Sequence, residues 1–218
     1  MKKIAVILSG CGNRDGSELQ ETLSLLLAID RRGWQYQCFA PEGFYDVVNH
    51  ASGVETGETR DIFVESARIA RGNIRMLSEY RPEDYDALAL PGGMGAARNL
   101  STYAYDGADM SVMDSVEDAV LAAVKAEKPV CAMCIAPMVL AKVLGKKGVE
   151  ITLGSDQNEA AQAARRLGAK TQACGPTDVC VDERLKVITT PAYMAAGRIS
   201  EIFDGAENMV SALTEFLG

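Results

Sequence analysis

The sequence predicts an α/β protein built as a three-layer doubly wound sandwich around a mostly parallel sheet. Short apolar runs rich in β-branched residues alternate with helical patterns along the chain. Continuous apolar runs are typical of strands buried on both faces, as in a parallel sheet covered by helices. The 218 residues, 48% hydrophobic and 24% charged, suffice for one large core. Because no repeat or linker interrupts them, we expect a single domain over residues 1–218.

The first strand and the first helix give the clearest patterns. The apolar run Ile4–Leu8 predicts the strand. Ser17 and Gln20 fit a capping box, and leucines at positions 19, 23, 26 and 27 recur at helical spacing. The helix is therefore predicted to follow Ser17, to bury these leucines and to end before Gly33.

The remaining elements continue the alternation. Strands are predicted at Gln37–Ala40, Ala87–Leu90, Val130–Met133, Ile151–Leu153 and Val187–Thr189. Helices are predicted near Ile62–Ala70, Val112–Ala126, Pro137–Leu144, Asn158–Leu167 and Ile199–Phe216. The segment Pro41–Gly57 has no clear period, so we expect either a hairpin or an excursion from the sheet.

Composition narrows the classes of function and location. The net charge of −8 and the scattered basic residues argue against nucleic-acid binding. The apolar start of the chain is too short for a signal peptide, and no apolar stretch reaches the roughly 20 residues that span a bilayer. We therefore expect a cytoplasmic protein that does not bind membranes. Its six cysteines are then expected to be free thiols, and the single histidine, His50, leaves little basis for a metal site.

Cys134 is the candidate nucleophile. It ends the apolar run Val130–Met133 and precedes a helix that begins with Pro137, and small Ala132 and Ala136 flank it as a nucleophile elbow requires. A cysteine near a helix N-terminus is expected to have a lowered pKa, which favours the reactive thiolate. The alternative from the residues alone is an inert buried cysteine.

Two other loops are expected to meet Cys134, because they too follow strands of the sheet. Glu18 lies in the first, glycine-rich loop, and its ordinary role would be to complement the helix dipole. Gly92 and Gly93 follow the strand Ala87–Leu90 and could offer backbone amides to a developing oxyanion, or could simply form a tight turn. Glycine spacing in the first loop does not match a dinucleotide site.

Other cysteine chemistry remains open. Cys131 and Cys134 form a C-x-x-C pattern, which could indicate a redox dithiol or half of a zinc site, although Cys131 lies inside the apolar run. Cys11, in the first loop, could resolve a sulfenic acid at Cys134.

With these motifs in place, the chain resembles the PfpI-like branch of the class I glutamine amidotransferase-like superfamily. Within it the chain looks like the ElbB-like isoprenoid biosynthesis proteins with an amidotransferase-like domain, which are described as glyoxalases. The resemblance rests on matches in order at Val6–Gly12, Asp15–Glu18, Cys38–Pro41, Asn49–His50, Pro91–Gly93, Met133–Pro137 and Thr189–Met194.

The resemblance implies a flavodoxin-like sandwich, often dimeric, with Cys134 as the elbow nucleophile. It also implies that Glu18 contacts the sulfur and that the amides of Gly93 and Ile135 face the oxyanion. The chain departs from true amidotransferases, which use a Cys-His-Glu triad, because no histidine follows His50.

The leading hypothesis is a glyoxalase that needs no cofactor and converts small 2-oxoaldehydes such as methylglyoxal and glyoxal into 2-hydroxy acids. Cys134 would be the nucleophile and Glu18 the general acid and base, with His50 as an alternative proton carrier or simply a structural residue. The expected partners are the aldehyde and a second copy in a homodimer. The alternatives are a non-catalytic cysteine redox sensor acting through partners, and an esterase or amidase.

Overall fold

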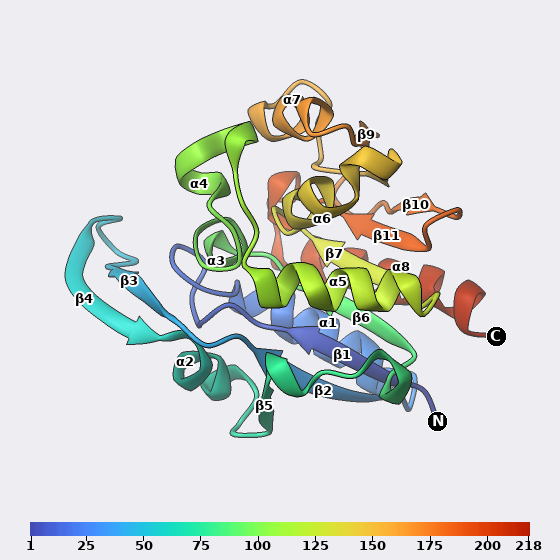
Figure 1. Cartoon of the computed structure of the whole chain (residues 1–218), viewed down its shortest axis with the longest axis horizontal. Helices are drawn as coiled ribbons and strands as arrows, with labels where there is room; N and C mark the ends of the chain where they lie inside the picture. The colour runs from blue at the N-terminus through green and yellow to red at the C-terminus, as the bar shows by residue number, and fades with distance from the viewer.

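A seven-stranded sheet lies at the centre of the protein, whose computed structural model describes residues 1–218 (Figure 1). The strand order is β10-β11-β7-β6-β1-β2-β5. The parallel strands are β1 (Lys3–Ile7), β2 (Gln35–Ala40), β5 (Ile74–Met76), β6 (Ala87–Leu90), β7 (Val130–Met133) and β11 (Val187–Thr190), and β10 (Cys180–Asp182) runs antiparallel to β11. The predicted α/β fold with a mostly parallel sheet is thus confirmed.

Helices cover both faces of this sheet. On one face lie α1 (Leu19–Arg31), α2 (Ile62–Ile69) and α8 (Ile199–Leu217), with α1 packed on α8. On the other lie α5 (Asp114–Lys125) and α6 (Pro137–Leu144), which appear in front of the sheet in Figure 1. The shorter α3 (Met94–Arg98), α4 (Tyr103–Asp106) and α7 (Glu159–Arg166) complete the helices. None is long and apolar enough to cross a membrane.

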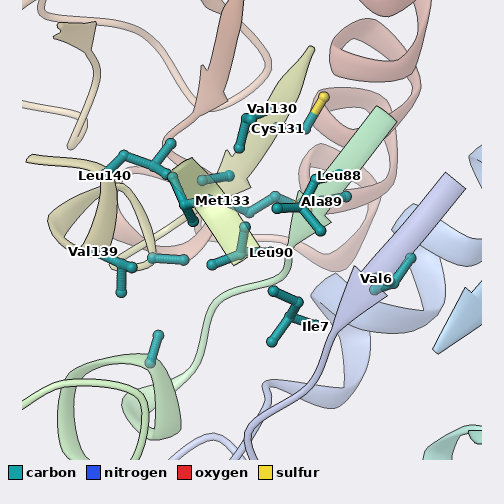
Figure 2. Packing of buried hydrophobic residues seen from close by; sticks show 14 of the residues in the cluster. Val6, Ile7, Leu88, Ala89, Leu90, Val130, Cys131, Met133, Val139 and Leu140 are labelled. Atoms are coloured by element: carbon teal, nitrogen blue, oxygen red, sulfur yellow. The ribbon is translucent and has the colours of Figure 1, made fainter. Parts of the chain in front are cut away.

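The central strands are buried on both faces, as their apolar runs predict. One cluster of 57 buried residues forms the core. Figure 2 shows Val6 and Ile7 of β1, Leu88 and Leu90 of β6 and Met133 of β7 within it. Burial on both faces holds the carboxyl ends of these three strands side by side, and the loops that carry the candidate site begin there.

The segment after β2 forms a hairpin of β3 (Phe44–Val48) and β4 (Glu55–Asp61), which projects from the body in Figure 1. Of the two alternatives for Pro41–Gly57, a hairpin or an excursion from the sheet, the structure has the hairpin, and β4 extends to Asp61.

The strand predicted at Ile151–Leu153 does not join the main sheet. Instead β8 (Glu150–Ile151) pairs only with β9 (Lys170–Thr171). Two backbone amides of this segment donate to side chains of the sheet instead of to backbone carbonyls. Glu150 N donates to Asp182 Oδ2 at 3.0 Å, and Thr152 N donates to Thr189 Oγ1 at 2.9 Å. These amides are therefore not available for pairing with a strand of the main sheet.

Helix α1 is rotated relative to the prediction. Leu19, Leu23 and Leu27 are exposed, whereas the buried side includes Glu21, Leu25 and Ile29. The helix also starts one residue later than the predicted capping box implies. Ser17 Oγ instead accepts a hydrogen bond from Ser9 N at 2.9 Å, so Glu18 becomes the N-cap residue. This shift decides which acid reaches the candidate site.

Candidate functional site

Three loops meet at the carboxyl ends of β1, β6 and β7, as predicted. Glu18 N donates to Gly92 O at 2.9 Å, and Met94 N donates to Asn13 O at 2.8 Å. Asn99 strengthens the junction, because its Nδ2 donates to the backbone oxygens of Ser9 and Asp15, both at 2.7 Å. These bonds join the first loop to the second along its length, so the site is built on the rigid end of the sheet.

Cys134 occupies the sharp turn between β7 and α6. Its φ of 58° is left-handed, a conformation that costs a non-glycine residue about 1–3 kcal/mol. The fully buried Ala132 and Ala136 leave room for this turn, and Cys134 N donates to Thr190 O of β11 at 3.0 Å. The elbow geometry that the sequence predicts is therefore present, with residue Cys134 9% exposed.

Glu21, and not Glu18, is the carboxyl group beside the sulfur. Glu21 is completely buried, its Oε1 accepts a hydrogen bond from Tyr193 N at 3.2 Å, and its carboxyl group faces the Cys134 thiol. Oε2 has no other hydrogen-bond partner. Gly92 lies between the two, since a Cβ there would be 2.3 Å from Glu21 Oε2 and 2.4 Å from Cys134 Cβ. The contact expected for Glu18 is thus made by the residue one helical turn later.

Glu18 instead caps helix α1. Its Oε2 accepts a hydrogen bond from Glu21 N at 2.6 Å, which fixes the carboxylate at the start of the helix. Partial burial raises its pKa, while the backbone amides of the first turn oppose that rise. Glu18 still lines the same cavity as Cys134, at its half-buried edge.

The pKa of the Cys134 thiol is raised. The sequence predicted a lowered pKa, so that prediction is wrong. Burial is the main cause, and the nearby Glu21 carboxylate adds to it, while the amides of Gly93 and Ile135 act in the opposite direction. The dipole of α6 is too remote to dominate, because the helix begins only at Pro137. Burial likewise raises the pKa of Glu21 to about 7. A resting thiolate is therefore not favoured, and the thiol has a carboxylate base beside it.

The amides of Gly93 and Ile135 point at the sulfur and have no backbone acceptor. At Gly93 the chain has a φ of +100°, and a Cβ there would be 2.4 Å from Glu18 N, so only glycine fits. Gly92 directs its amide toward Glu21 instead. Two backbone donors without a backbone acceptor thus face the Cys134 sulfur.

A cavity of about 160 Å³ opens onto the thiol. Its lining residues are Asn13, Glu18, Glu21, Gly93, Met94, Cys134, Ile135, Tyr193 and Met194. Since a water molecule takes about 30 Å³ in the liquid, the cavity holds a molecule of only a few non-hydrogen atoms.

The accessory residues proposed from the sequence lie outside this cavity. His50 Nδ1 bonds to Val48 O at 2.9 Å, and its Nε2 accepts a hydrogen bond from Arg14 N at 3.3 Å. Cys11 is half-buried, with Glu65 and Arg68 among its charged neighbours. Cys131 is buried within β7 (Figure 2), and burial raises its pKa to about 12. No residue group in the structure could hold a metal ion.

Sequence reasoning missed Glu21 and Tyr193. The signal for Glu21 was a single acid on the helix side that also carries Leu25 and Ile29, and a buried unpaired acid in such a position marks a functional site. The signal for Tyr193 was weaker. Its loop follows β11, the strand next to the one that ends at Cys134.

The fold and the site define a class, namely flavodoxin-like α/β sandwiches with a cysteine at a nucleophile elbow. Residues 3–193 match the model of the DJ-1/PfpI family, and the chain belongs to that family. The PfpI resemblance found in the sequence is therefore confirmed at the level of the family and of the amidotransferase-like fold.

Similar proteins come from several organisms. The chain is 41% identical over 226 residues to the "ES1 protein homolog, mitochondrial" of Rattus norvegicus, covering 99% of this chain and 84% of the relative. A solved isoprenoid biosynthesis protein with an amidotransferase-like domain from Ehrlichia chaffeensis is 33% identical, with a TM-score of 0.93 and full coverage of both chains. Glyoxalase III from Candida albicans shares the fold at a TM-score of 0.62 and 17% identity, covering 97% of each chain.

These relatives overturn one expectation. The rat relative and those from human and zebrafish are all named as mitochondrial proteins. The cytoplasmic location predicted from the sequence is therefore contradicted by the names of these relatives.

Proposed function

We propose that the protein is a cofactor-independent glyoxalase that converts small 2-oxoaldehydes, such as methylglyoxal and glyoxal, into 2-hydroxy acids. The observation that carries the proposal is the buried Cys134–Glu21 pair, faced by the free amides of Gly93 and Ile135. A nucleophile, a base and an oxyanion site are thereby grouped around one small cavity. The glyoxalase III of Candida albicans has the same fold, which is compatible with this chemistry.

The first step is activation of the thiol. Glu21 accepts the proton of Cys134 through Oε2, because Oε1 already accepts a hydrogen bond from Tyr193 N. A pKa of about 7 suits a group that works as a base near neutral pH. The thiolate attacks the aldehyde carbon, and the oxyanion that forms receives hydrogen bonds from Gly93 N and Ile135 N. Glu21 returns its proton to this oxygen, which gives the neutral hemithioacetal and makes Glu21 a carboxylate again.

The second step moves hydrogen between the two carbons of the substrate. A carboxylate removes the proton from the former aldehyde carbon to give an enediol, and the proton returns to the neighbouring carbon to give a thioester. Water then cleaves the thioester, which releases the 2-hydroxy acid and restores the thiol. We assign this proton transfer to Glu21 in place of Glu18, because Glu21 is the carboxyl group beside the sulfur.

The other hypotheses have less geometric support. True amidotransferases use a Cys-His-Glu triad for glutamine hydrolysis, and His50 bonds to the first loop and to Val48 instead of the thiol. The esterase or amidase hypothesis stays a prediction, which a burst with an activated ester would test. Oxidation of Cys134 as a redox signal stays a prediction, as does the homodimer, which light scattering would test.

The test is lactate formation from methylglyoxal by the wild type and by matched variants. Cys134→Ala and Glu21→Gln are each expected to lower kcat/KM by about 10²-fold or more, the usual contribution of a nucleophile or a general base. Cys174→Ala removes a half-buried thiol elsewhere and is expected to retain full activity. No lactate from the wild type, or equal rates in all variants, would refute the proposal. Stoichiometric oxidation of Cys134 by mild peroxide without turnover would favour the redox hypothesis.

A further inference from the structure

The two carboxyl groups of the cavity are held in different ways. The Glu18 carboxylate accepts the amide of Glu21 at 2.6 Å and faces the other free amides of the first helical turn. Backbone amides and the helix dipole stabilise the charged form of an N-cap carboxyl group. Glu21 is fully buried, and burial favours its neutral form. Partial burial raises the pKa of Glu18 as well, but hydrogen bonds oppose that rise, so Glu18 is the carboxyl group of the site that is held in its charged form by hydrogen bonds.

No positive charge balances Glu18. None of the residues that line the cavity is a lysine, arginine or histidine. Neither carboxyl group has a basic side chain within ion-pair distance. The rest of the wall is largely apolar, with Met94, Ile135 and Met194 lining it. A molecule entering the cavity thus meets one uncompensated anion and otherwise mostly apolar surface.

We propose that Glu18 is a specificity-determining residue, which makes the cavity accept small neutral carbonyl compounds and reject those that carry a carboxylate. The consequence for catalysis rests on the proposed function. Its substrate, a 2-oxoaldehyde, is neutral, whereas its product, a 2-hydroxy acid, is anionic. The same charge then admits the substrate and favours release of the product.

The size of the effect follows from Coulomb's law. Two like charges about 6 Å apart, at the effective dielectric constant of 20 to 80 that suits a half-exposed site, interact strongly enough to change a rate by about threefold to a hundredfold. Salt weakens the effect, because the mouth of the cavity is open to solvent.

The test alkylates Cys134 with reagents of similar size and different charge, so it does not depend on turnover. Neutral iodoacetamide and anionic iodoacetate are compared at pH 6, below the pKa of about 7 of Glu21, so that Glu21 stays mostly neutral. The products are followed by intact mass, with N-acetylcysteine amide as the reference thiol. We expect wild-type Cys134 to prefer iodoacetamide about tenfold more strongly than the reference thiol does. Glu18→Gln is expected to remove most of that excess. A change in thiol pKa affects both reagents equally and cancels in the ratio.

Two further variants separate charge from fold. Glu18→Asn keeps a good helix N-cap and is expected to behave like Glu18→Gln. Asp30→Asn removes one exposed charge from the same helix and is expected to leave the wild-type ratio unchanged. Cationic 2-bromoethylamine should show the reverse preference, with the wild type reacting faster than Glu18→Gln.

An unchanged ratio in both Glu18 variants would overturn the inference. An equal fall of the ratio in Asp30→Asn would also overturn it, because the effect would then come from the net charge of the protein and not from the position of Glu18. If the ratio responds as expected while no aldehyde is converted, the proposed function fails and the charge selectivity stands. If lactate forms and the ratio does not respond, the proposed function stands and the charge selectivity fails.

Discussion

Replacing Glu21 with glutamine is expected to change the pH dependence of stability in a way that can be calculated. Burial raises the pKa of Glu21 from the ordinary 4.5 to about 7 in the folded protein. A carboxyl group with a raised folded pKa contributes its full stability below the unfolded pKa and loses that contribution as the pH rises through the folded pKa. Each pKa unit corresponds to about 1.36 kcal/mol, so ionising Glu21 lowers the free energy of unfolding by about 3 kcal/mol between pH 4.5 and 7.5.

Glutamine is a close match for the protonated side chain. Its oxygen can still accept the hydrogen bond from Tyr193 N, and its amide nitrogen takes the place of Oε2 beside the sulfur. The variant should therefore be close to the wild type in stability at pH 5 and about 3 kcal/mol more stable at pH 8.

The assay is urea unfolding of both proteins at several pH values from 5 to 8, followed by circular dichroism and fitted with a common slope. Other titrating groups are shared, so they cancel in the difference between the two curves. Parallel curves across this range would refute the reasoning, because they would mean that Glu21 ionises in the folded protein as easily as in the unfolded chain.

Three further outcomes follow from the same geometry. The kcat/KM for methylglyoxal should rise with pH through a midpoint near 7, where Glu21 becomes ionised, and stopped assays from pH 5.5 to 8 would reveal a flat profile if another group is the base. Gly92→Ala should abolish activity, because its Cβ would overlap both Glu21 Oε2 and Cys134 Cβ, and retained turnover would mean that the pair is not rigid. Asn99→Ala should cost about 1–3 kcal/mol in urea unfolding, because it leaves the buried oxygen of Ser9 without its donor.

The sequence was sufficient to predict the parts of the fold that rest on continuous burial. The runs Ile4–Leu8, Ala87–Leu90 and Val130–Met133 became β1, β6 and β7, because only strands covered on both faces need such uniformly apolar residues. The edge strands β5 and β10 were missed. Each of these strands has three residues, one of them charged. The formation of so short a strand depends more on pairing with its neighbour than on its own sequence.

The site was predicted where local chain geometry determines it and misread where distant contacts do. Cys134 stands at an elbow because small alanines and Pro137 surround it in the sequence. Its thiol pKa depends on burial and on Glu21, which no local pattern reveals. The helix start depends on Ser17, whose hydroxyl bonds to Ser9, just after strand β1, and so does not cap the helix.

That one-residue shift accounts for the roles of the two acids. Residues 18 and 21 are three apart, so they lie on the same side of α1 and both reach the cavity. The one at the N-cap accepts backbone amides and is kept charged, whereas the one a turn later is buried against the sulfur and is kept near neutrality. Burial raises the pKa of both side chains, but hydrogen bonds from backbone amides oppose this rise at Glu18. Identical side chains in different environments are the usual basis for dividing work between charge and proton transfer. With the cap at Ser17, Glu18 would be the first residue of the helix and would lose the N-cap position from which it accepts the amide of Glu21.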